Sequence, residues 1–331
     1  METINESTVT PTHEVMNDEA PLVEVDKLNV YYRSTHAVKD LSFVIPRGEI
    51  FGFIGPNGAG KTSTFKVLAT LLKPHPSSGR VAINGVDVSK QPHKIRRMIG
   101  YAPDFFGVYD DLTVSEYLHF FAAAYRLNAA RRKATVADVL ALTDLTEKEN
   151  APVDGLSRGM KQRLSIARLL IHDPQLLILD EPASGLDPRA RIEMRELLKE
   201  LQRLGKTILI SSHILHELSQ LCTRIGILEA GNWVTEGSLD EIFSTLDMRR
   251  ILHLQVANQS EELLGKLRAI EAIERVDEDL DRLALHFNES LASPEDLHAA
   301  IHATGARIQM FQPQAMDMET VFMKLTEGKT A

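Results

Sequence analysis

Residues 55–62, "GPNGAGKT", form the strongest motif in this chain. It matches the pattern G-x-x-x-x-G-K-[S/T], with an apolar run before it and a helical pattern after it, which is the context that a phosphate-binding loop requires. Gly58 and Gly60 allow successive backbone N–H groups to point inward around a phosphate. Lys61 then reaches the β- and γ-phosphates of a nucleotide, and the Thr62 hydroxyl is placed to hold Mg²⁺. The loop therefore predicts a site for a nucleoside triphosphate.

Strand and helix patterns flank the loop. "LVEVDKLNVYY" (22–32) and "LSFVIPRGEIFGFIG" (41–55) are rich in β-branched and aromatic residues and are broken by a "PRGE" turn, so we expect strands there. Residues 62–72 have a helical pattern. "RVAINGVDV" (80–88) predicts a hairpin, because Asn84-Gly85 suits a two-residue turn.

Later segments predict a parallel sheet. "LLILD" (176–180) and "KTILISSH" (206–213) are short apolar runs, typical of strands buried on both faces. Between them, "PRARIEMRELLKELQRLG" (188–205) is an amphipathic helix that ends at Gly205. Strand, helix and strand in alternation imply parallel strands with right-handed crossovers. Residues 110–170 are helical in pattern, with a capping box in "LTVSEYLHFF" (112–121), and we expect a separate lobe inserted into the sheet.

Two acidic residues and a histidine follow the ends of these strands. Asp180 closes "LLILD" and is placed to hold Mg²⁺, while Glu181 is placed to orient or deprotonate a water that attacks the γ-phosphate. His213 ends the next strand, in position to donate a hydrogen bond to that phosphate. Two other interpretations of His213 stay open: a histidine that caps a helix, or half of a metal site with His216, although the chain has no "H-E-x-x-H".

A second place to hold an anion lies in "LSRGMKQRL" (156–164). Ser157 stands where a helix would begin, Gly159 leaves the backbone bare, and Lys161 and Arg163 add positive charge. Exposed N–H groups and the helix macrodipole attract phosphate at such a start. Taken alone, this stretch indicates a capped surface helix. Beside the loop at 55–62, it raises the question of why one chain carries two phosphate sites.

These elements, in this order, resemble the ATP-binding cassette of ABC transporters over roughly residues 21–245. "GPNGAGKT" is similar to the Walker A loop, "LLILDEP" to Walker B, "LSRGMKQRL" to the signature motif, "SGLD" (184–187) to the D-loop and His213 to the switch histidine. The resemblance implies an α/β fold of the P-loop class: a RecA-like parallel sheet core with an antiparallel β subdomain and a helical subdomain at about 105–170. The details are most similar to exporter-type cassettes that work with a separately encoded permease.

The resemblance also implies that two cassettes pair head to tail, so that the signature of one closes over the ATP held by the other. ATP and Mg²⁺ are the implied ligands, with Glu181 and His213 catalytic and with Thr62, Asp180 and Asp104 at the metal. Asp187 of the D-loop contacts the partner's phosphate loop, although Asp187-Pro188 is also typical of a plain helix start. The implied ATP-binding residues are Tyr32, Gly55, Pro56, Asn57, Gly58, Ala59, Gly60, Lys61, Thr62 and Ser63, and the implied signature contacts are Ser157, Arg158, Gly159 and Met160.

Three features depart from the family pattern or leave a choice. Arg158 and Met160 replace the usual Gly and Gln of the signature, which puts one polar contact to the nucleotide in question. Asp104 replaces the usual Q-loop Gln; a carboxylate still ligates Mg²⁺, but it adds negative charge beside the phosphates, so we expect modest activity. The aromatic under the adenine is Tyr31 or Tyr32, and the spacing to "LSF" favours Tyr32; a buried strand tyrosine is the alternative.

Composition and sequence pattern also limit the class of protein and the character of the two ends of the chain. The chain has 331 residues, a net charge of −9 and one cysteine, Cys222, which we interpret as a small core residue. The acidic balance argues against general nucleic-acid binding, and no apolar run approaches the roughly 20 residues that cross a bilayer. Residues 1–20 are acidic and polar and predict a flexible tail. Residues 246–331 predict a small accessory α+β module in the order β-α-β-β-α-β, followed by a last helix, "METVFMKLT" (318–326).

The leading hypothesis is an ATPase subunit that drives substrate export by a permease, in a cassette homodimer at the cytoplasmic face of the membrane, peripheral through the permease. The helical lobe would meet the permease through aromatic side chains that either face outward or belong to an ordinary core: Phe105, Phe106, Tyr109 and Phe120. The alternative is a soluble ABC ATPase that acts as a regulatory or mechanical module. Its relatives usually carry two cassettes or a long coiled coil, and this chain has one phosphate loop and no heptad run.

Overall fold

The computed structural model describes residues 20–104, 107, 111–238, 241–242, 251–279, 282–288 and 291–313. The tail predicted at 1–20 lies almost entirely outside these residues, as do Phe105, Phe106, Tyr109 and the predicted last helix. Among the helices that are described, none is both long enough and apolar enough to cross a bilayer.

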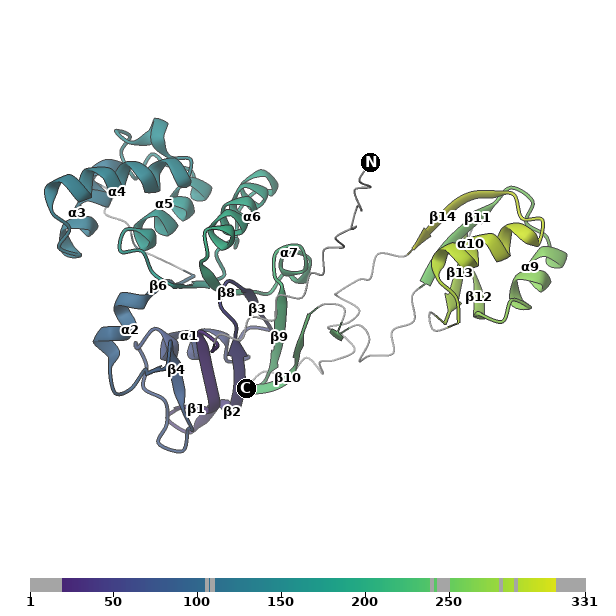
Figure 1. Cartoon of the computed structure of the whole chain (residues 1–331), viewed down its shortest axis with the longest axis horizontal. Coiled ribbons are helices and arrows are strands. Elements are labelled where there is room, and N and C mark those ends of the chain that lie inside the picture. The colour runs from purple at the N-terminus through teal and green to yellow at the C-terminus, as the bar shows by residue number, and fades with distance from the viewer. Residues whose placement is uncertain are drawn as a thin grey trace, which may run out of the picture.

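A six-stranded sheet of order β10-β9-β3-β8-β7-β6 forms the centre of the larger unit (Figure 1). Five neighbouring strands run parallel, and β10 closes one edge in antiparallel register with β9. β3, β7 and β8 are buried along their whole length, which confirms the strands predicted from the apolar runs at 176–180 and 206–213. The strands are β3 (Ile50–Ile54), β6 (Ile99–Ala102), β7 (Leu176–Asp180), β8 (Thr207–Ser212), β9 (Arg224–Glu229) and β10 (Asn232–Gly237).

An antiparallel sheet of order β2-β1-β4-β5 packs against one side of this centre. The predicted hairpin is present: Asn84 and Gly85 form the turn with φ of 50° and 71°. An aromatic cluster of Phe43, Phe51 and Trp233 joins this sheet to the central one. The elements of this side are β1 (Val23–Tyr32), β2 (Thr35–Ile45), β4 (Val81–Ile83), β5 (Val86–Asp87), α1 (Lys61–Leu68) and α2 (Pro92–Met98).

Helices cover the other face of the central sheet. The predicted capping box of Thr113 and Glu116 starts α3, and Gly205, with φ of 82°, follows the end of α6. The helices are α3 (Val114–Ala124), α4 (Ala129–Leu142), the 3₁₀ turn η1 (Thr146–Lys148), α5 (Arg158–Leu170), α6 (Pro188–Arg203) and α7 (Leu215–Ser219).

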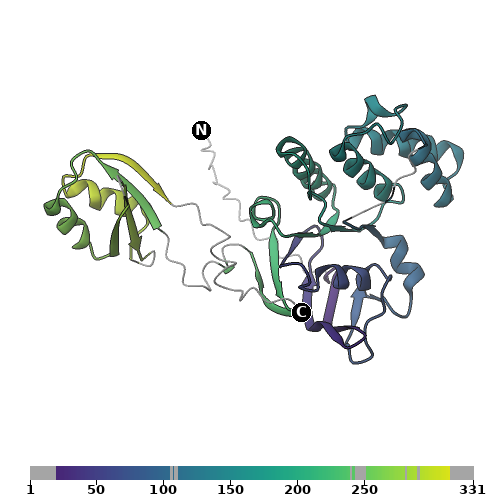
Figure 2. The ribbon, with the colours of Figure 1, turned by 180° about the vertical axis from the view of Figure 1, so that it is seen from behind.

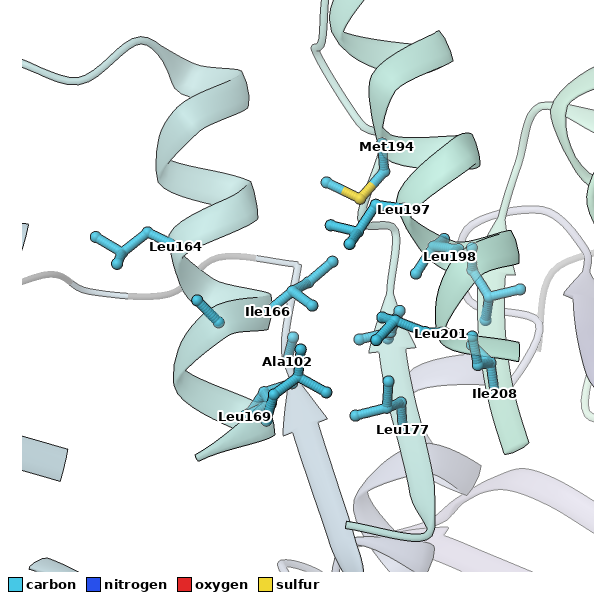
Figure 3. Packing of buried hydrophobic residues seen from close by; sticks show 14 of the residues in the cluster. Ala102, Leu164, Ile166, Leu169, Leu177, Met194, Leu197, Leu198, Leu201 and Ile208 are labelled. Atoms are coloured by element: carbon cyan, nitrogen blue, oxygen red, sulfur yellow. The ribbon is translucent and has the colours of Figure 1, made fainter. Parts of the chain in front are cut away.

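The helical lobe and this sheet face share one hydrophobic core. Buried residues of α3, α4 and α5 belong to the same cluster as those of α6 and of the strands below it. In Figure 3, Ile166 of α5 and Leu197 of α6 point toward one another above Leu177 of β7. α5 therefore packs against both the lobe and the sheet, so its N-terminal end has a fixed position relative to the carboxyl ends of the strands.

The C-terminal module has its own core and its own sheet, of order β12-β13-β11-β14. Its elements follow the predicted order β-α-β-β-α-β, and Figures 1 and 2 show it as a separate group of elements. The elements are β11 (Ile251–Val256), α9 (Glu261–Arg268), β12 (Ile273–Asp279), β13 (Arg282–Phe287), α10 (Pro294–Ala303) and β14 (Ile308–Pro313).

Candidate functional site

The loop at 55–62 joins β3 to α1 and is tightly enclosed by β2 on one side and by β9 of the central sheet on the other. Gly58 and Gly60 have φ of 85° and 107°, a region that side chains rarely adopt. A Cβ on Gly60 would lie 2.8 Å from the carbonyl oxygen of Ala37 in β2, and one on Gly55 would collide with the carbonyl oxygen of Leu228. Glycine is therefore required here both for backbone direction and for the close approach of neighbouring strands.

Lys61 lies inside the loop with 6% of its surface exposed. Its Nζ donates to the carbonyl oxygens of Gly55 (2.5 Å) and Pro56 (3.3 Å) and lies 3.8 Å from Oε1 of Glu181. Burial lowers the pKa of Lys61, and the carboxylates of Glu181 and Asp180 partly offset that effect. The ammonium is thus held in place by groups that a phosphate oxygen can replace.

Asp180, at the end of β7, is 2% exposed and accepts two hydrogen bonds. The Thr62 hydroxyl donates to its Oδ2 (2.7 Å) and the Ser211 hydroxyl to its Oδ1 (2.6 Å). Ser211 also accepts from the backbone N–H of Glu181 (3.0 Å). The carboxylate and the hydroxyl of Thr62 therefore lie together, and they are oxygen donors of the kind that Mg²⁺ prefers.

Glu181 and His213 form a direct pair. Oε2 of Glu181 lies 2.7 Å from Nδ1 of His213, and because a carboxylate only accepts, Nδ1 carries the proton. Glu181 is 13% exposed on its side chain and His213 is 53% exposed. Glu181 has φ of 51°, which is unusual for a residue other than glycine, and such a conformation persists only where its surroundings hold it.

A cavity of about 350 Å³ lies over the loop and collects most of the predicted nucleotide contacts. Tyr32 lines it, with its hydroxyl 3.3 Å from Oγ of Ser63, whereas Tyr31 is absent from the lining and stacks on His36. The lining residues are Tyr32, Thr35, Ala37, Pro56, Asn57, Gly58, Ala59, Gly60, Lys61, Thr62, Ser63, Asp104, Asp180 and Glu181. Thr35 and Ala37 were not predicted, because β2 reaches the loop only through the tertiary fold.

The signature and D-loop residues lie elsewhere on the same chain. Ser157 caps α5 by accepting from the N–H of Met160 (3.3 Å), and Asp187 caps α6 by accepting from the N–H of Ala190 (2.9 Å). Neither residue lines the cavity over the loop, and neither do Arg158, Gly159 and Met160. One chain thus brings together the loop, Asp104, Asp180 and Glu181, but not the signature.

Two side chains near the site have structural roles. Burial raises the pKa of the Cys222 thiol strongly, and its Sγ packs where a Cβ on Gly52 would lie, in agreement with a core residue rather than a nucleophile. His216 contacts the Gln220 side chain (2.8 Å). Among the described residues, no group of three or more His, Cys, Asp or Glu side chains is placed to hold a metal, which disfavours the His213–His216 alternative.

Tyr101 in β6 predicts a stability change at alkaline pH. Burial, the charge of Asp180 and the neighbouring Tyr32 raise its pKa to about 12, and its buried hydroxyl has no hydrogen-bond partner within the described part of the chain. The folded state therefore holds this proton above pH 10 where the unfolded state releases it, so the unfolding free energy falls as pH rises from 10 to 12.

Thermal unfolding of Tyr101→Phe measures this effect. We expect the stability of the variant relative to the parent to be higher at pH 11 than at pH 8, by on the order of 1 kcal/mol. An equal difference at both pH values would contradict the assignment.

Comparison with known proteins agrees with this geometry. The sequence model of the ABC transporter family matches residues 38–184. The chain is 33% identical over 313 residues to the linearmycin resistance ATP-binding protein LnrL of Bacillus subtilis (strain 168). The alignment covers 93% of this chain and 99% of that protein. It is 34% identical over 310 residues to the Nod factor export ATP-binding protein I of Burkholderia pseudomallei (strain 1710b). This alignment covers 92% of this chain and 96% of that protein.

Solved structures give the same result for the larger unit. The structure of an ATP-binding subunit of an ABC transporter superposes with a TM-score of 0.61 at 34% identity, covering 68% of this chain and 93% of the other. That of cbiO1 from Clostridium perfringens, part of the ABC transporter complex cbiONQ, has a TM-score of 0.63 at 31% identity, covering 69% and 93%. Since one relative aligns over nearly its whole length, the chain belongs to the ABC transporter family, as one of its ATP-binding ATPase proteins.

Proposed function

We propose that this chain hydrolyses ATP as one half of a cassette pair and drives export through a separate permease. One observation carries the proposal: most of the predicted cis contacts, Lys61 and Glu181 included, line the cavity over the loop, while Ser157 and Asp187 lie outside it. Gly55 and His213 do not line it, but Gly55 accepts from Lys61 and His213 pairs with Glu181. A complete nucleotide site then needs the signature of a second copy. This arrangement also explains why one chain carries two phosphate-binding motifs.

Mg²⁺ fits the donors at Asp180. Thr62 and Asp180 would hold it, with Asp104 lining the same cavity, because a hydroxyl and carboxylates with room for water suit this ion. The ion would supply charge that neutralises the phosphates. Asp104 adds a negative charge where the family usually has a neutral amide, so the net gain from the ion is smaller, and we infer a modest turnover.

Residues of this chain then have different roles in binding and hydrolysing ATP. Lys61 exchanges its carbonyl partners for phosphate oxygens, and Tyr32 stacks on the adenine. Glu181 orients or deprotonates the attacking water, and His213, already paired with Glu181, contacts the γ-phosphate. Ser157, Gly159 and the N–H groups that start α5 close over the nucleotide of the other copy, where the helix macrodipole favours phosphate.

Coupling to a permease requires an exposed contact surface, and the helical lobe offers one. Phe120 in α3 is 51% exposed and Tyr125, directly after α3, is 43% exposed. Exposed aromatic side chains favour a protein contact. Export is supported by one relative, which is an export ATP-binding protein. Placement at the cytoplasmic face of the membrane follows from the proposed contact with the permease. Because the chain has a net charge of −9, we expect no nucleic acid partner.

Purification from native membranes tests this partnership. A tagged chain solubilised in mild detergent is expected to carry a protein with several membrane spans, and Phe120→Asp is expected to lose it while still binding ATP. A chain that carries no such protein, or that sediments with ribosomes or DNA, would contradict the permease role and favour the regulatory module.

A further inference from the structure

The segment that carries Glu181 is a tight turn, residues 181–187, which we call the catalytic turn. It begins at Glu181 with φ of 51° and contains Gly185 with φ of 66°. Two internal bonds close it: Ser184 N–H to Glu181 C=O (3.0 Å) and Leu186 N–H to Ala183 C=O (3.2 Å). Leu186 is buried, whereas Gly185 is exposed. Buried Leu186 anchors the base of the turn. The tip of the turn, at Gly185, is exposed and carries no side chain.

Arg158 covers that tip. A Cβ on Gly185 would lie 2.5 Å from Nη1 and 2.7 Å from Nη2 of Arg158, and it would be at least as close to Cζ of the same side chain. Because the central carbon and both terminal nitrogens of the guanidinium are about equally near, the guanidinium plane lies flat over Gly185. Glycine can adopt backbone conformations that other residues avoid, so a flat group resting on Gly185 restricts the conformations open to the turn.

Two further contacts hold the first turns of α5 against α6. A Cβ on Gly159 would lie 2.9 Å from Cβ of Ala190, so the two helices touch there. One turn further along, Nη2 of Arg163 lies 3.6 Å from Glu193 in α6, and Nη1 of Arg163 lies 2.8 Å from Asp144. The backbone that carries Arg158 is therefore fixed relative to α6.

We propose that Arg158 is a positioning residue that holds the catalytic turn, and through it Glu181, by resting its guanidinium plane on Gly185. Its contact with the turn is made within one chain. It is thus separate from any contact between the signature and a second copy's nucleotide. The inference rests on the proposed role of Glu181. It also gives the replacement of the usual signature glycine by Arg158 a mechanical reason.

Steady-state ATP hydrolysis by Arg158→Ala tests the proposal. We expect kcat to fall about 10-fold, because a small displacement of a reacting group has a large effect on rate, while the Kd for ATP of the isolated chain stays within twofold. Arg158→Lys is expected to behave like Arg158→Ala, since an ammonium cannot lie flat on the turn. In a Glu181→Gln background, Arg158→Ala is expected to keep ATP-driven dimerisation. Arg203→Ala, a change of an exposed arginine at the far end of α6, is the control and should leave kcat within twofold.

Gly185→Ala tests the contact from the other side. The added methyl displaces the guanidinium, so kcat should fall, and the double variant with Arg158→Ala should be no slower than the slower single variant. Multiplicative effects would overturn the proposal. An Arg158→Ala enzyme with the parent's kcat would also overturn the proposal. If Arg158→Lys restores full activity and Arg158→Ala loses ATP-driven dimerisation, Arg158 instead contacts the partner's nucleotide, and the proposal fails. If Glu181→Gln itself hydrolyses ATP at the parent's rate, the proposed function fails, whatever Arg158 does.

Discussion

Lys61→Met is expected to lower kcat/KM for ATP by at least 100-fold, on the order expected when a charge that stabilises a phosphoryl-transfer transition state is removed. Methionine keeps most of the volume of this buried side chain but removes its charge. The carbonyl oxygens of Gly55 and Pro56 then lose their donor, and the phosphates lose the ammonium that lies 3.8 Å from Glu181. We therefore expect weaker ATP binding as well as slower turnover.

Equilibrium binding of a fluorescent ATP analogue and steady-state phosphate release measure the two effects of Lys61→Met. Lys66→Met, at the other end of the same helix, is the matched control and should retain the parent's binding. Thermal unfolding shows whether the variant is folded. A folded Lys61→Met protein with normal ATP affinity and turnover would remove the phosphate loop from the site.

Glu181→Gln is expected to bind ATP normally, to lose at least about 100-fold in kcat and to accumulate as a nucleotide-bound dimer. The amide has the shape of the carboxylate, so the contact to His213 and the backbone of the catalytic turn remain. It cannot accept a proton, so ATP stays intact between two copies and the dimer is not released.

Size-exclusion chromatography with and without Mg-ATP measures the trapped dimer. Glu196→Gln, an exposed glutamate on α6, is the control and should elute like the parent under both conditions. A Glu181→Gln protein that hydrolyses ATP as fast as the parent would show that Glu181 is not the base.

The centre of the fold could be predicted because its signals are local. "LLILD" is apolar at every position but the last, since both faces of β7 are covered, and the charged Asp180 marks the end of the strand. Thr113 and Glu116 are three residues apart, so their capping box needs no tertiary information. The loop at 55–62 combines glycines, a lysine and a threonine whose roles follow from their spacing.

Other parts of the site could not be predicted, because they depend on contacts between distant segments. Ser211 supports both Asp180 and the backbone of Glu181, yet in the sequence it is one of two serines before His213. Thr35 and Ala37 reach the cavity only because the first hairpin folds over the loop. No element was predicted for 224–237, where β9 and β10 form a hairpin whose turn has Ala230 at φ of 50° in place of the usual Asn or Asp.

The packing of the helical lobe against the central sheet could not be predicted from the sequence either. Periodicity separates the helical pattern of 110–170 from the strands, and this suggested a separate lobe. In the structure, the lobe and one sheet face belong to a single hydrophobic cluster. The face of a helix that packs on two partners is apolar over a wide arc, and periodicity does not show which part meets which partner.

In the proposed dimer, one chain supplies the phosphate loop of each site and a second chain supplies the signature. Mixing two inactive variants tests this shared site. Lys61→Met lacks a working loop and keeps its signature. Ser157→Asp keeps its loop and its helix cap, because Asp caps a helix as well as Ser does, but it places a negative charge against the partner's phosphates.

Each variant alone is expected to be nearly inactive, and an equal mixture is expected to recover up to about a quarter of the parent's ATPase activity, because half of the dimers are mixed and each holds one intact composite site. A mixture no more active than the mean of the two separate variants would contradict the account.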